Sequence, residues 1–351
     1  MKRSEKYMRC EMKAAVFTGK HQLEIREMPC VEPKEDEVLI RVRFCGVCGT
    51  DVHIYEGDKG SAEVDGETIL GHELSGEVVR TGKSVTRIRT GDRVAADPND
   101  YCGTCYYCTN GMKHLCNRMV GLGTAADGGF AQYLTVPERL VYKIPDSVSY
   151  EQAAMIEPIS CCLHGIDLTD IRPGNTVMVV GAGNIGMIMI QLAKSAGAAR
   201  VIAVDPVEVR LARAKEYGAE IVINPTKDDT EEVLGKNNVE CVDRVIDCAG
   251  RVSTAEYAVR YAGKGAVVML FGLTGPDDVA GIKPFELFKK ELTVKASFVN
   301  PDTFARSIFL LEKGIVDVDK IITDIVPLED IGMVFDTKLY SKNGKVLINC
   351  E

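Results

Sequence analysis

Two patterns of hydrophobic and polar residues divide the chain. Over about the first hundred residues, short alternating or β-branched runs are bounded by Gly, Pro and Asp, which is typical of strands joined by turns. Helical spacing is hard to find in this part, so the pattern predicts a β-rich unit. The predicted strands are MKAAVFT (12–18), EVLIRVRFCGV (37–47), LSGEVVRTG (74–82) and DRVAADP (92–98).

From about residue 162 the pattern changes to strands that alternate with helices. Strands separated by helices of about ten to fifteen residues imply right-handed crossovers and a parallel sheet. A further helix (302–314) and a final strand (345–349) form a tail that is compatible with a return to the first unit. The other predicted strands are 176–183, 199–205, 219–224, 243–250 and 265–272, and the other predicted helices are 184–197 and 207–218.

Composition narrows the class of protein. The chain has 351 residues, which predicts about two domains, and 46% hydrophobic and 26% charged residues are ordinary for a soluble globular protein. The formal charge of −9 argues against binding to a phosphate backbone. No run of eighteen apolar residues is present, so we expect no membrane-spanning helix. The N-terminal segment is charged and lacks an apolar core, so we expect no export and a cytoplasmic protein.

Thirteen cysteines, an odd number, favour reduced thiols and metal ligands over a disulfide framework. Four of them form the pattern Cys102-x2-Cys105-x2-Cys108-x7-Cys116, and four thiolates satisfy tetrahedral zinc in a closed, structural site. An iron–sulfur run closes with a three-residue gap and a proline, whereas this one closes with seven residues. A plain cysteine-rich loop is the remaining alternative. We interpret seven others as small buried hydrophobes: Cys10, Cys30, Cys161, Cys162, Cys241, Cys248 and Cys350.

A glycine-rich turn, GAGNIG (181–186), follows the strand at 176 directly and begins a helix. Gly181, Gly183 and Gly186 suit a tight turn, close approach of a pyrophosphate, and helix–strand packing, and Ile185 lies among them. Asp205 closes the next strand, where a carboxylate can bind ribose hydroxyls. A structural glycine turn is the alternative interpretation.

Asp205 also bears on cofactor choice. A carboxylate binds the ribose hydroxyls but repels a 2′-phosphate, so the sequence favours NAD over NADP. Arg210 and Arg213 are near in sequence and would soften that preference, although both also fit the exposed face of a helix.

A second set of residues has the mixed chemistry of a catalytic zinc, which needs about three protein ligands and one open position. Each member alone has an ordinary structural explanation, and composition does not choose between Cys45 and Cys48 as the thiolate. The set is Cys48, Thr50, His53, His72, Glu73 and Glu157.

The sequence resembles zinc-dependent members of the medium-chain dehydrogenase/reductase superfamily, near its polyol (sorbitol/arabinitol-type) and threonine dehydrogenases. The resemblance rests on CGTDVH (48–53), GHELSGEV (71–78), GDRV (91–94), the four cysteines, IEP (156–158) and GAGNIG (181–186). It implies an α/β protein in which a Rossmann domain (161–297), a doubly wound parallel sheet, is inserted into a GroES-like β-rich catalytic domain. The catalytic domain would comprise 1–160 and 298–351, with a zinc lobe near 97–118.

The resemblance also implies roles for the second set. Cys48, the cysteine before Gly-Thr-Asp, and His72 match ligands of a catalytic zinc. Glu73 matches a carboxylate that ligates in polyol dehydrogenases, and Glu157 is expected at or near the metal without a permanent bond. Zinc would act as a Lewis acid toward a secondary alcohol while hydride passes to the nicotinamide. Thr50 would accept the substrate proton, and His53, an imidazole that exchanges protons near neutral pH, would pass it to solvent.

The substrate is predicted less closely. A polar, acidic site favours a polyol. Sorbitol dehydrogenases that resemble those of animals have an Arg in this segment that helps to hold the polyol. This sequence has Val299 at that position, which argues against sorbitol itself as the substrate. L-threonine 3-dehydrogenase is the main alternative, since it shares CGTDVHIY nearly as written. A non-catalytic sensor that binds NAD and zinc is an alternative of another class. Zinc-free quinone reductases lack both cysteine sets, and the related enzymes are usually homotetramers or homodimers.

Overall fold

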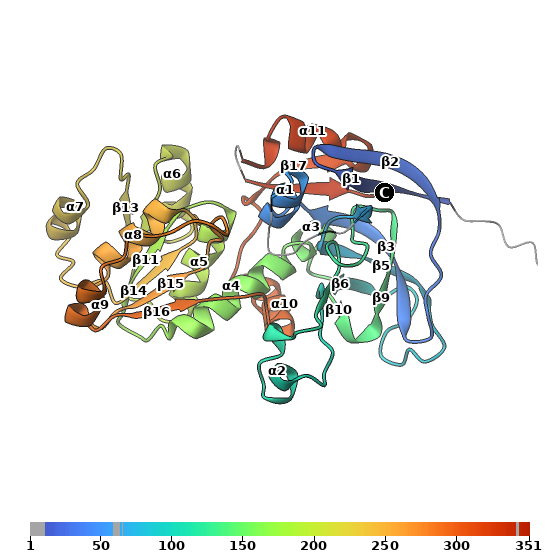
Figure 1. Cartoon of the computed structure of the whole chain (residues 1–351), viewed down its shortest axis with the longest axis horizontal. Coiled ribbons are helices and arrows are strands. Elements are labelled where there is room, and N and C mark those ends of the chain that lie inside the picture. The colour runs from blue at the N-terminus through green and yellow to red at the C-terminus, as the bar shows by residue number, and fades with distance from the viewer. Residues whose placement is uncertain (1–10, 59–63, 65, 342–343) are drawn as a thin grey trace, which may run out of the picture. The chain divides into compact units, whose positions relative to one another are not determined.

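The computed structural model describes residues 11–58, 64, 66–341 and 344–351. The chain divides into two compact units. The first comprises residues 1–102, 118–157 and 322–351, and the second comprises 103–117 and 158–321. Figure 1 traces both units by residue number.

The first unit consists mainly of antiparallel sheets. Its main sheet has the order β10-β6-β5-β3-β18-β17, with β9 also paired to β3, and a smaller one has the order β2-β1-β4. Its helices are α1 (Gly49–Tyr55), α3 (Tyr150–Ala153) and α11 (Ile331–Asp336). Its strands are β1 (Glu11–Gly19), β2 (Gln22–Pro29), β3 (Glu37–Gly46), β4 (Thr68–Ile69), β5 (Glu73–Thr81), β6 (Arg93–Ala96), β7 (Asn99–Asp100), β8 (Val120–Gly121), β9 (Tyr133–Pro137), β10 (Val141–Lys143), β17 (Ile322–Pro327) and β18 (Lys345–Asn349).

The four strand runs predicted in this unit are confirmed as β1, β3, β5 and β6. Alternation explains them, because every second residue of β3 (Val38, Ile40 and Val42) is fully buried in the core. The tail does return to this unit, since β18 pairs antiparallel with β3 and places Leu347 opposite Gly46.

Helix α1 was not predicted. It is only seven residues long, and its buried apolar residues are Ile54 and Tyr55, too few to produce a helical pattern in the sequence. The helix ends in a Schellman motif at Gly57, whose φ of 73° suits a residue without a side chain. The Gly57 N–H donates to the Ile54 carbonyl, and the Asp58 N–H donates to the His53 carbonyl.

The second unit is a doubly wound α/β sheet. Its six strands are all parallel in the order β13-β12-β11-β14-β15-β16, which is the 3-2-1-4-5-6 order of a Rossmann fold. The predicted fold class is therefore confirmed. The strands are β11 (Thr176–Val180), β12 (Arg200–Val204), β13 (Ile221–Ile223), β14 (Arg244–Asp247), β15 (Val267–Leu270) and β16 (Thr293–Ala296). The helices are α2 (Tyr106–Thr109), α4 (Ile156–Thr169), α5 (Asn184–Ser195), α6 (Glu208–Glu216), α7 (Thr230–Lys236), α8 (Val252–Tyr261), α9 (Pro284–Lys290) and α10 (Phe304–Glu312), with the first two residues of α4 in the first unit.

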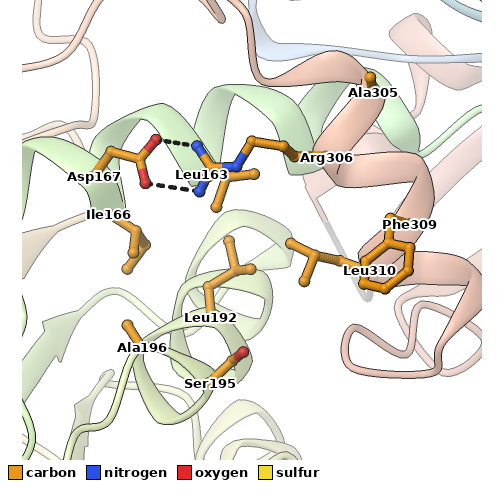
Figure 2. Close-up of a pocket in the computed structure, with 10 residues that line it drawn as sticks. All are labelled: Leu163, Ile166, Asp167, Leu192, Ser195, Ala196, Ala305, Arg306, Phe309 and Leu310. Atoms are coloured by element: carbon orange, nitrogen blue, oxygen red, sulfur yellow. Dashed lines mark hydrogen bonds and ion pairs between the residues drawn. The ribbon is translucent and has the colours of Figure 1, made fainter.

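The division between units differs from the predicted one at residues 298–321, which lie with the Rossmann sheet. Side chains explain this placement: Arg306 on α10 forms a two-bond ion pair with Asp167 on α4 (Figure 2), and the Thr303 hydroxyl donates to the Ser160 carbonyl. The same helices and α5 line an open pocket of about 480 Å³. Residues 103–117 also lie with this unit, and Lys113 pairs with Asp302 there.

The cysteines outside the predicted metal sites vary in burial. Cys162 and Cys350 are buried as predicted, whereas Cys161, Cys241 and Cys248 are only half-buried. Cys30 is disulfide-bonded, so the prediction of a buried free thiol is wrong there. Cys10 lies outside the described residues. No helix in the described part of the chain has the length and apolarity needed to cross a membrane.

Candidate metal centre and dinucleotide site

The first unit brings two separated sequence segments together at the ends of neighbouring strands. β3 and β5 are antiparallel, and Gly46 at the end of β3 is opposite Glu73 at the start of β5. Cys48 follows β3 at the N-cap of α1, and His72 precedes β5. One ligand atom from each of Cys48, His72 and Glu73 lies within 4.8 Å of the others. The geometry therefore offers a thiol, an imidazole and a carboxylate to a single ion.

Asp51 connects these two segments. Its carboxylate is fully buried and accepts hydrogen bonds from the Cys48 N–H (2.8 Å) and the Gly71 N–H (3.3 Å). It also lies 3.6 Å from the Nδ1 of His72. This contact is an ion pair rather than a hydrogen bond, and it places a carboxylate on the side of the imidazole where an orienting partner of a metal ligand lies. Asp51 was not predicted from the sequence, because helix α1, whose N-cap lies three residues before it, has too few apolar residues to produce a pattern.

Lys345 is the second residue that sequence analysis missed. Its ammonium group pairs with Glu73, and the two residues are 5% and 1% exposed. Gly46 makes room for this pair, because a Cβ there would lie 2.8 Å from the Cε of Lys345. Burial acts to lower the pKa of Lys345, but the charges of Glu73 and Cys48 outweigh it and raise the pKa. No local pattern around KVLIN distinguishes this lysine from an exposed one.

The remaining predicted residues lie on the same unit but outside the three-residue group. Glu157, on the first turn of α4, is 8% exposed and is close enough to Lys345 to raise its pKa. Thr50 and His53 lie on α1. The Nδ1 of His53 is 3.5 Å from the carboxylate of Asp58, and both side chains are solvent-accessible.

The donor set of the group suits zinc. Structural and catalytic zinc sites combine Cys, His and carboxylate ligands, and three protein ligands leave a fourth position open. The structure also distinguishes Cys45 from Cys48, which composition left as equally plausible thiolate ligands. Cys45 is fully buried in the apolar core, where burial raises its pKa well above the ordinary value, and it is not in the group.

The four cysteines of the lobe form a second group whose sulfur atoms lie within 4.8 Å of one another. The Sγ atoms of Cys105 and Cys116 are 3.8 Å apart, which matches the roughly 3.8 Å edge of a tetrahedron with Zn–S bonds of about 2.3 Å. Gly103 and Gly111, predicted as flexible links, have φ of 71° and 75°. The backbone therefore turns where glycine allows it, and the thiols fit one zinc ion.

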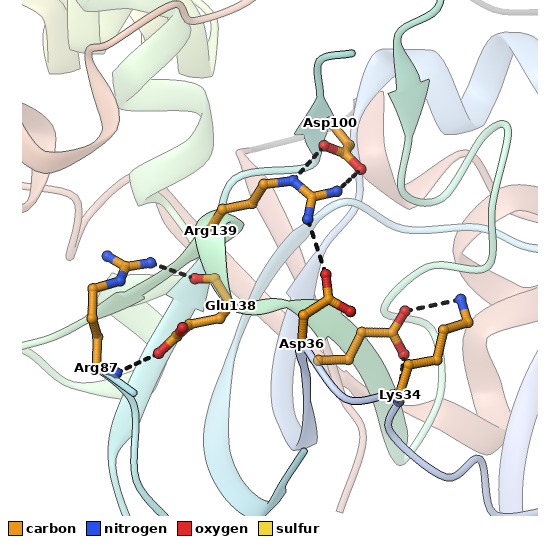
Figure 3. A network of polar contacts seen from close by, with 7 residues as sticks. Lys34, Asp36, Arg87, Asp100, Glu138 and Arg139 are labelled. Carbon is orange, nitrogen blue, oxygen red and sulfur yellow. Dashed lines mark hydrogen bonds and ion pairs between the residues drawn. The ribbon is translucent and has the colours of Figure 1, made fainter. Parts of the chain in front are cut away.

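An ion-pair network holds the strand that leads into this lobe (Figure 3). Arg139 donates to both carboxylate oxygens of Asp100 on β7 and pairs with Asp36. The neighbouring Glu138 carboxylate accepts the backbone N–H groups of Thr86 and Ile88. These contacts fix the chain two residues before the first cysteine ligand.

The glycine turn has the geometry that a dinucleotide site requires. Gly181 has φ of 92°, which favours glycine in the turn. A Cβ at Gly183 would meet nothing within 4 Å, so this backbone is open to a ligand. Gly186 packs so closely on the carbonyl of Gly181 that no side chain fits. The motif lies between β11 and α5, at the carboxyl end of the sheet where strand order reverses.

Asp205 follows β12 and is 3% exposed. Its two oxygens accept hydrogen bonds from the N–H groups of Ala182 and Val207, both at 2.8 Å. Arg210 lies beside it, with Nη1 at 3.8 Å. The carboxylate is thus fixed next to the glycine turn and retains free lone pairs for a ribose.

Comparison with known proteins shows the family of the chain. Residues 34–146 match the alcohol dehydrogenase GroES-like domain family and residues 184–313 match the zinc-binding dehydrogenase family. The chain is 35% identical to sorbitol dehydrogenase of Bacillus subtilis (strain 168), covering 95% of both chains. It is 34% identical to L-threonine 3-dehydrogenase of Bacillus velezensis, covering 92% of this chain and 94% of the other.

A solved structure shows the same fold. It is a protein of Sinorhizobium meliloti 1021, described as a zinc-binding dehydrogenase bound to NADP, with 34% identity and a TM-score of 0.93 over 97% of this chain and 99% of that one. With relatives above 30% identity over nearly the whole chain, the family is established. The chain belongs to the zinc-dependent medium-chain dehydrogenase/reductase family and is an alcohol or polyol dehydrogenase that uses zinc and a nicotinamide cofactor.

Proposed function

We propose that the protein transfers hydride between a secondary alcohol, a polyol, and NAD. The observation that carries this proposal is the convergence of Cys48, His72 and Glu73 in a chain whose second unit has an open glycine turn. A thiolate–imidazole–carboxylate set and a dinucleotide site are the two parts that such a reaction needs.

Cys48 and His72 would hold the catalytic zinc, with Glu73 and Glu157 as the carboxylates beside it, and the four lobe cysteines would hold a structural zinc. When bound, the catalytic ion supplies Lewis-acid chemistry that favours loss of the alcohol proton. Asp51 orients His72 and links its loop to that of Cys48. Thr50 receives the substrate proton, and His53, which is solvent-accessible, releases it.

In the second unit, the backbone at Gly181, Gly183, Ile185 and Gly186 binds the pyrophosphate, since the N-terminus of α5 attracts negative charge. Asp205 binds the adenosine ribose and Arg210 lies at its edge. This arrangement favours NAD, because a 2′-phosphate would face a buried carboxylate that backbone N–H groups hold in place.

Asp205→Ala tests the cofactor assignment. Loss of the carboxylate removes two ribose hydrogen bonds and the repulsion of a 2′-phosphate, so we expect kcat/KM for NAD to fall by about 10- to 100-fold and the preference over NADP to shrink. Steady-state kinetics with each cofactor measures both effects. Equal use of NAD and NADP by the unmodified protein would contradict the assignment, and Asp243→Ala, a change immediately before β14, serves as a control.

Two substrate classes are candidates, a polyol and L-threonine. A site that contains the carboxylates Glu73 and Glu157 suits a polyhydroxy substrate, and the similarity to a sorbitol dehydrogenase supports a polyol. Val299 lacks the guanidinium that would hold sorbitol, and its φ of 48° is unusual for a β-branched residue. L-threonine is the second candidate because of the comparable similarity to a threonine dehydrogenase.

A panel of pentitols, hexitols, their phosphates, 2,3-butanediol and L-threonine, read by NADH absorbance, tests the proposal. The expected result is NAD reduction with at least one polyol. Activity on L-threonine alone would replace the polyol with the second candidate. No reduction with any alcohol, in protein that contains both zinc ions, would favour the non-catalytic sensor instead.

We also propose a homo-oligomer formed through the Rossmann unit. β16 is at the edge of the parallel sheet and exposes Val294, and helix α9 exposes Phe285 and Phe288 (67% and 82%). Pairing this edge with a second copy would cover unpaired backbone groups and apolar rings. Light scattering should give a mass of two or four chains rather than one.

A further inference from the structure

Two histidines that the proposed function does not use lie side by side in the second unit. His114 is in the 3-10 turn Lys113–Leu115 of the lobe, and His164 is on α4. Their ring centroids are 5.3 Å apart, and the ring planes are inclined at 64°. The two imidazoles therefore form a direct contact between the lobe and the helix.

Each of these rings has a nitrogen atom without a partner. The Nδ1 of His114 and the Nε2 of His164 are buried and make no hydrogen bond to any residue that the structure describes. His164 as a whole is only 9% exposed. A buried polar atom without a partner is unfavourable, and in native proteins such an atom usually binds an ion or a water molecule. The pair thus presents two buried nitrogen atoms that one ion could satisfy.

The separation of the rings matches the geometry of two ligands on one metal ion. A zinc–nitrogen bond of about 2.0–2.1 Å places the centre of an imidazole ring roughly 3.2 Å from the ion. Two such ligands at a tetrahedral angle have ring centroids about 5.2 Å apart, and the observed separation is 5.3 Å. The lobe and α4 are therefore already at the spacing that a shared ion requires.

The carboxylates that act electrostatically on the two rings are already paired. Asp302, which acts on His114, forms an ion pair with Lys113. Asp167, which acts on His164, binds a guanidinium group on α10. The ligands at this contact are therefore nitrogen atoms, which favour Zn²⁺, Ni²⁺ or Cu²⁺ over Mg²⁺ and Ca²⁺, because the latter two prefer oxygen.

We propose that His114 and His164 form a third metal site, which takes a divalent transition-metal ion and fastens the lobe to α4. Two protein ligands make fewer bonds than the three- and four-residue groups, so the ion is held more weakly and dialysed protein carries metal only at the other two sites. The ion stabilises the lobe, which has little core of its own, because it binds the folded arrangement alone. This inference goes beyond the proposed function, since neither histidine takes part in catalysis or cofactor binding there.

Titration of the dialysed, zinc-loaded protein with Ni²⁺, in a preparation without a histidine tag, tests the inference. Calorimetry should detect one Ni²⁺ per chain, while elemental analysis shows that both zinc ions remain. His114→Asn and His164→Asn should each weaken Ni²⁺ binding by at least about tenfold, because residues that only support a ligand already contribute this much. The double variant should bind about as weakly as either single variant, since one change already removes the chelate.

A control variant and a second measurement make the test specific. His21→Asn removes an exposed histidine that pairs with Glu56, and it should leave the Ni²⁺ affinity unchanged. Ni²⁺ should also slow limited proteolysis between residues 102 and 116 in the unmodified protein but not in His164→Asn. Because His164 lies outside the lobe, this variant distinguishes an ion that connects two segments from one that binds the lobe alone. A thermal melt and a zinc content of two per chain confirm that each variant is folded.

Three results would overturn the inference. The first is that Ni²⁺ binds only by replacing zinc, and the second is that both asparagine variants retain the Ni²⁺ affinity of the unmodified protein. The third is Ni²⁺ binding that leaves proteolysis of the lobe unchanged, because the ion would then not fasten the lobe to α4. None of these results bears on the proposed function, which the alcohol panel tests without either histidine, so the two proposals can fail separately.

Discussion

Replacing Cys48 by serine is expected to abolish turnover while NAD binding persists. The change removes the thiolate ligand on one side of the Cys48–His72–Glu73 group, so the metal is lost or misplaced. Loss of a residue that only contacts a metal ligand already lowers metal affinity or activity by about 10- to 100-fold. Loss of a ligand itself should therefore lower kcat/KM by at least about 100-fold. His72→Ala should act in the same way. The glycine turn belongs to the other unit, so the affinity for NADH should stay within about threefold.

The measurements are kcat/KM with the identified alcohol, NADH affinity by fluorescence, and zinc per chain, which should fall from two to one. Cys45→Ala is the matched control, because Cys45 is three residues away in sequence but is packed in the core. It should lose stability rather than zinc. Near-normal turnover in Cys48→Ser, or loss of zinc in Cys45→Ala, would contradict the ligand assignment.

Cys108→Ser is expected to release the structural zinc and to destabilise the lobe. Helix α2 and the 3-10 turn Lys113–Leu115 contribute no buried residues, so the lobe has little core of its own. A segment of this kind depends on its metal for folding. We expect a loss of one zinc per chain and a decrease in the thermal midpoint on the order of 5–10 °C.

Metal analysis, a thermal melt and limited proteolysis between residues 102 and 116 measure the effect. Cys241→Ser, a half-buried free cysteine outside the lobe, is the control and should leave the zinc content at two. A Cys108→Ser protein that keeps two zinc ions and resists proteolysis would show that the four thiols do not hold a metal.

The parts of the fold that the sequence predicted best depend on local patterns. Alternation in β3 and the glycine turn before α5 are read within ten residues, and both match the structure. α1 was missed because a two-turn helix with Ile54 and Tyr55 as its apolar residues has no periodic pattern. Contacts such as the ion pair between Arg306 and Asp167, which are 139 residues apart, leave no local pattern in the sequence.

In the candidate site, too, only residues within short motifs could be predicted from the sequence. Cys48, His72 and Glu73 were predicted from short motifs and from a family resemblance, and the structure brings them together. The position of Lys345 at the site could not be predicted from the sequence, because it depends on the pairing of β18 with β3. A lysine at the start of a strand usually extends into solvent, and only the three-dimensional position beside Glu73 changes that interpretation.

The most direct test of the central claim is anomalous diffraction at the zinc absorption edge from crystals of the protein as purified. Two peaks per chain are predicted, one among the four lobe cysteines and one bonded to both the Sγ of Cys48 and the imidazole of His72. A map with the lobe peak alone, or with the second ion on other residues, would contradict the account.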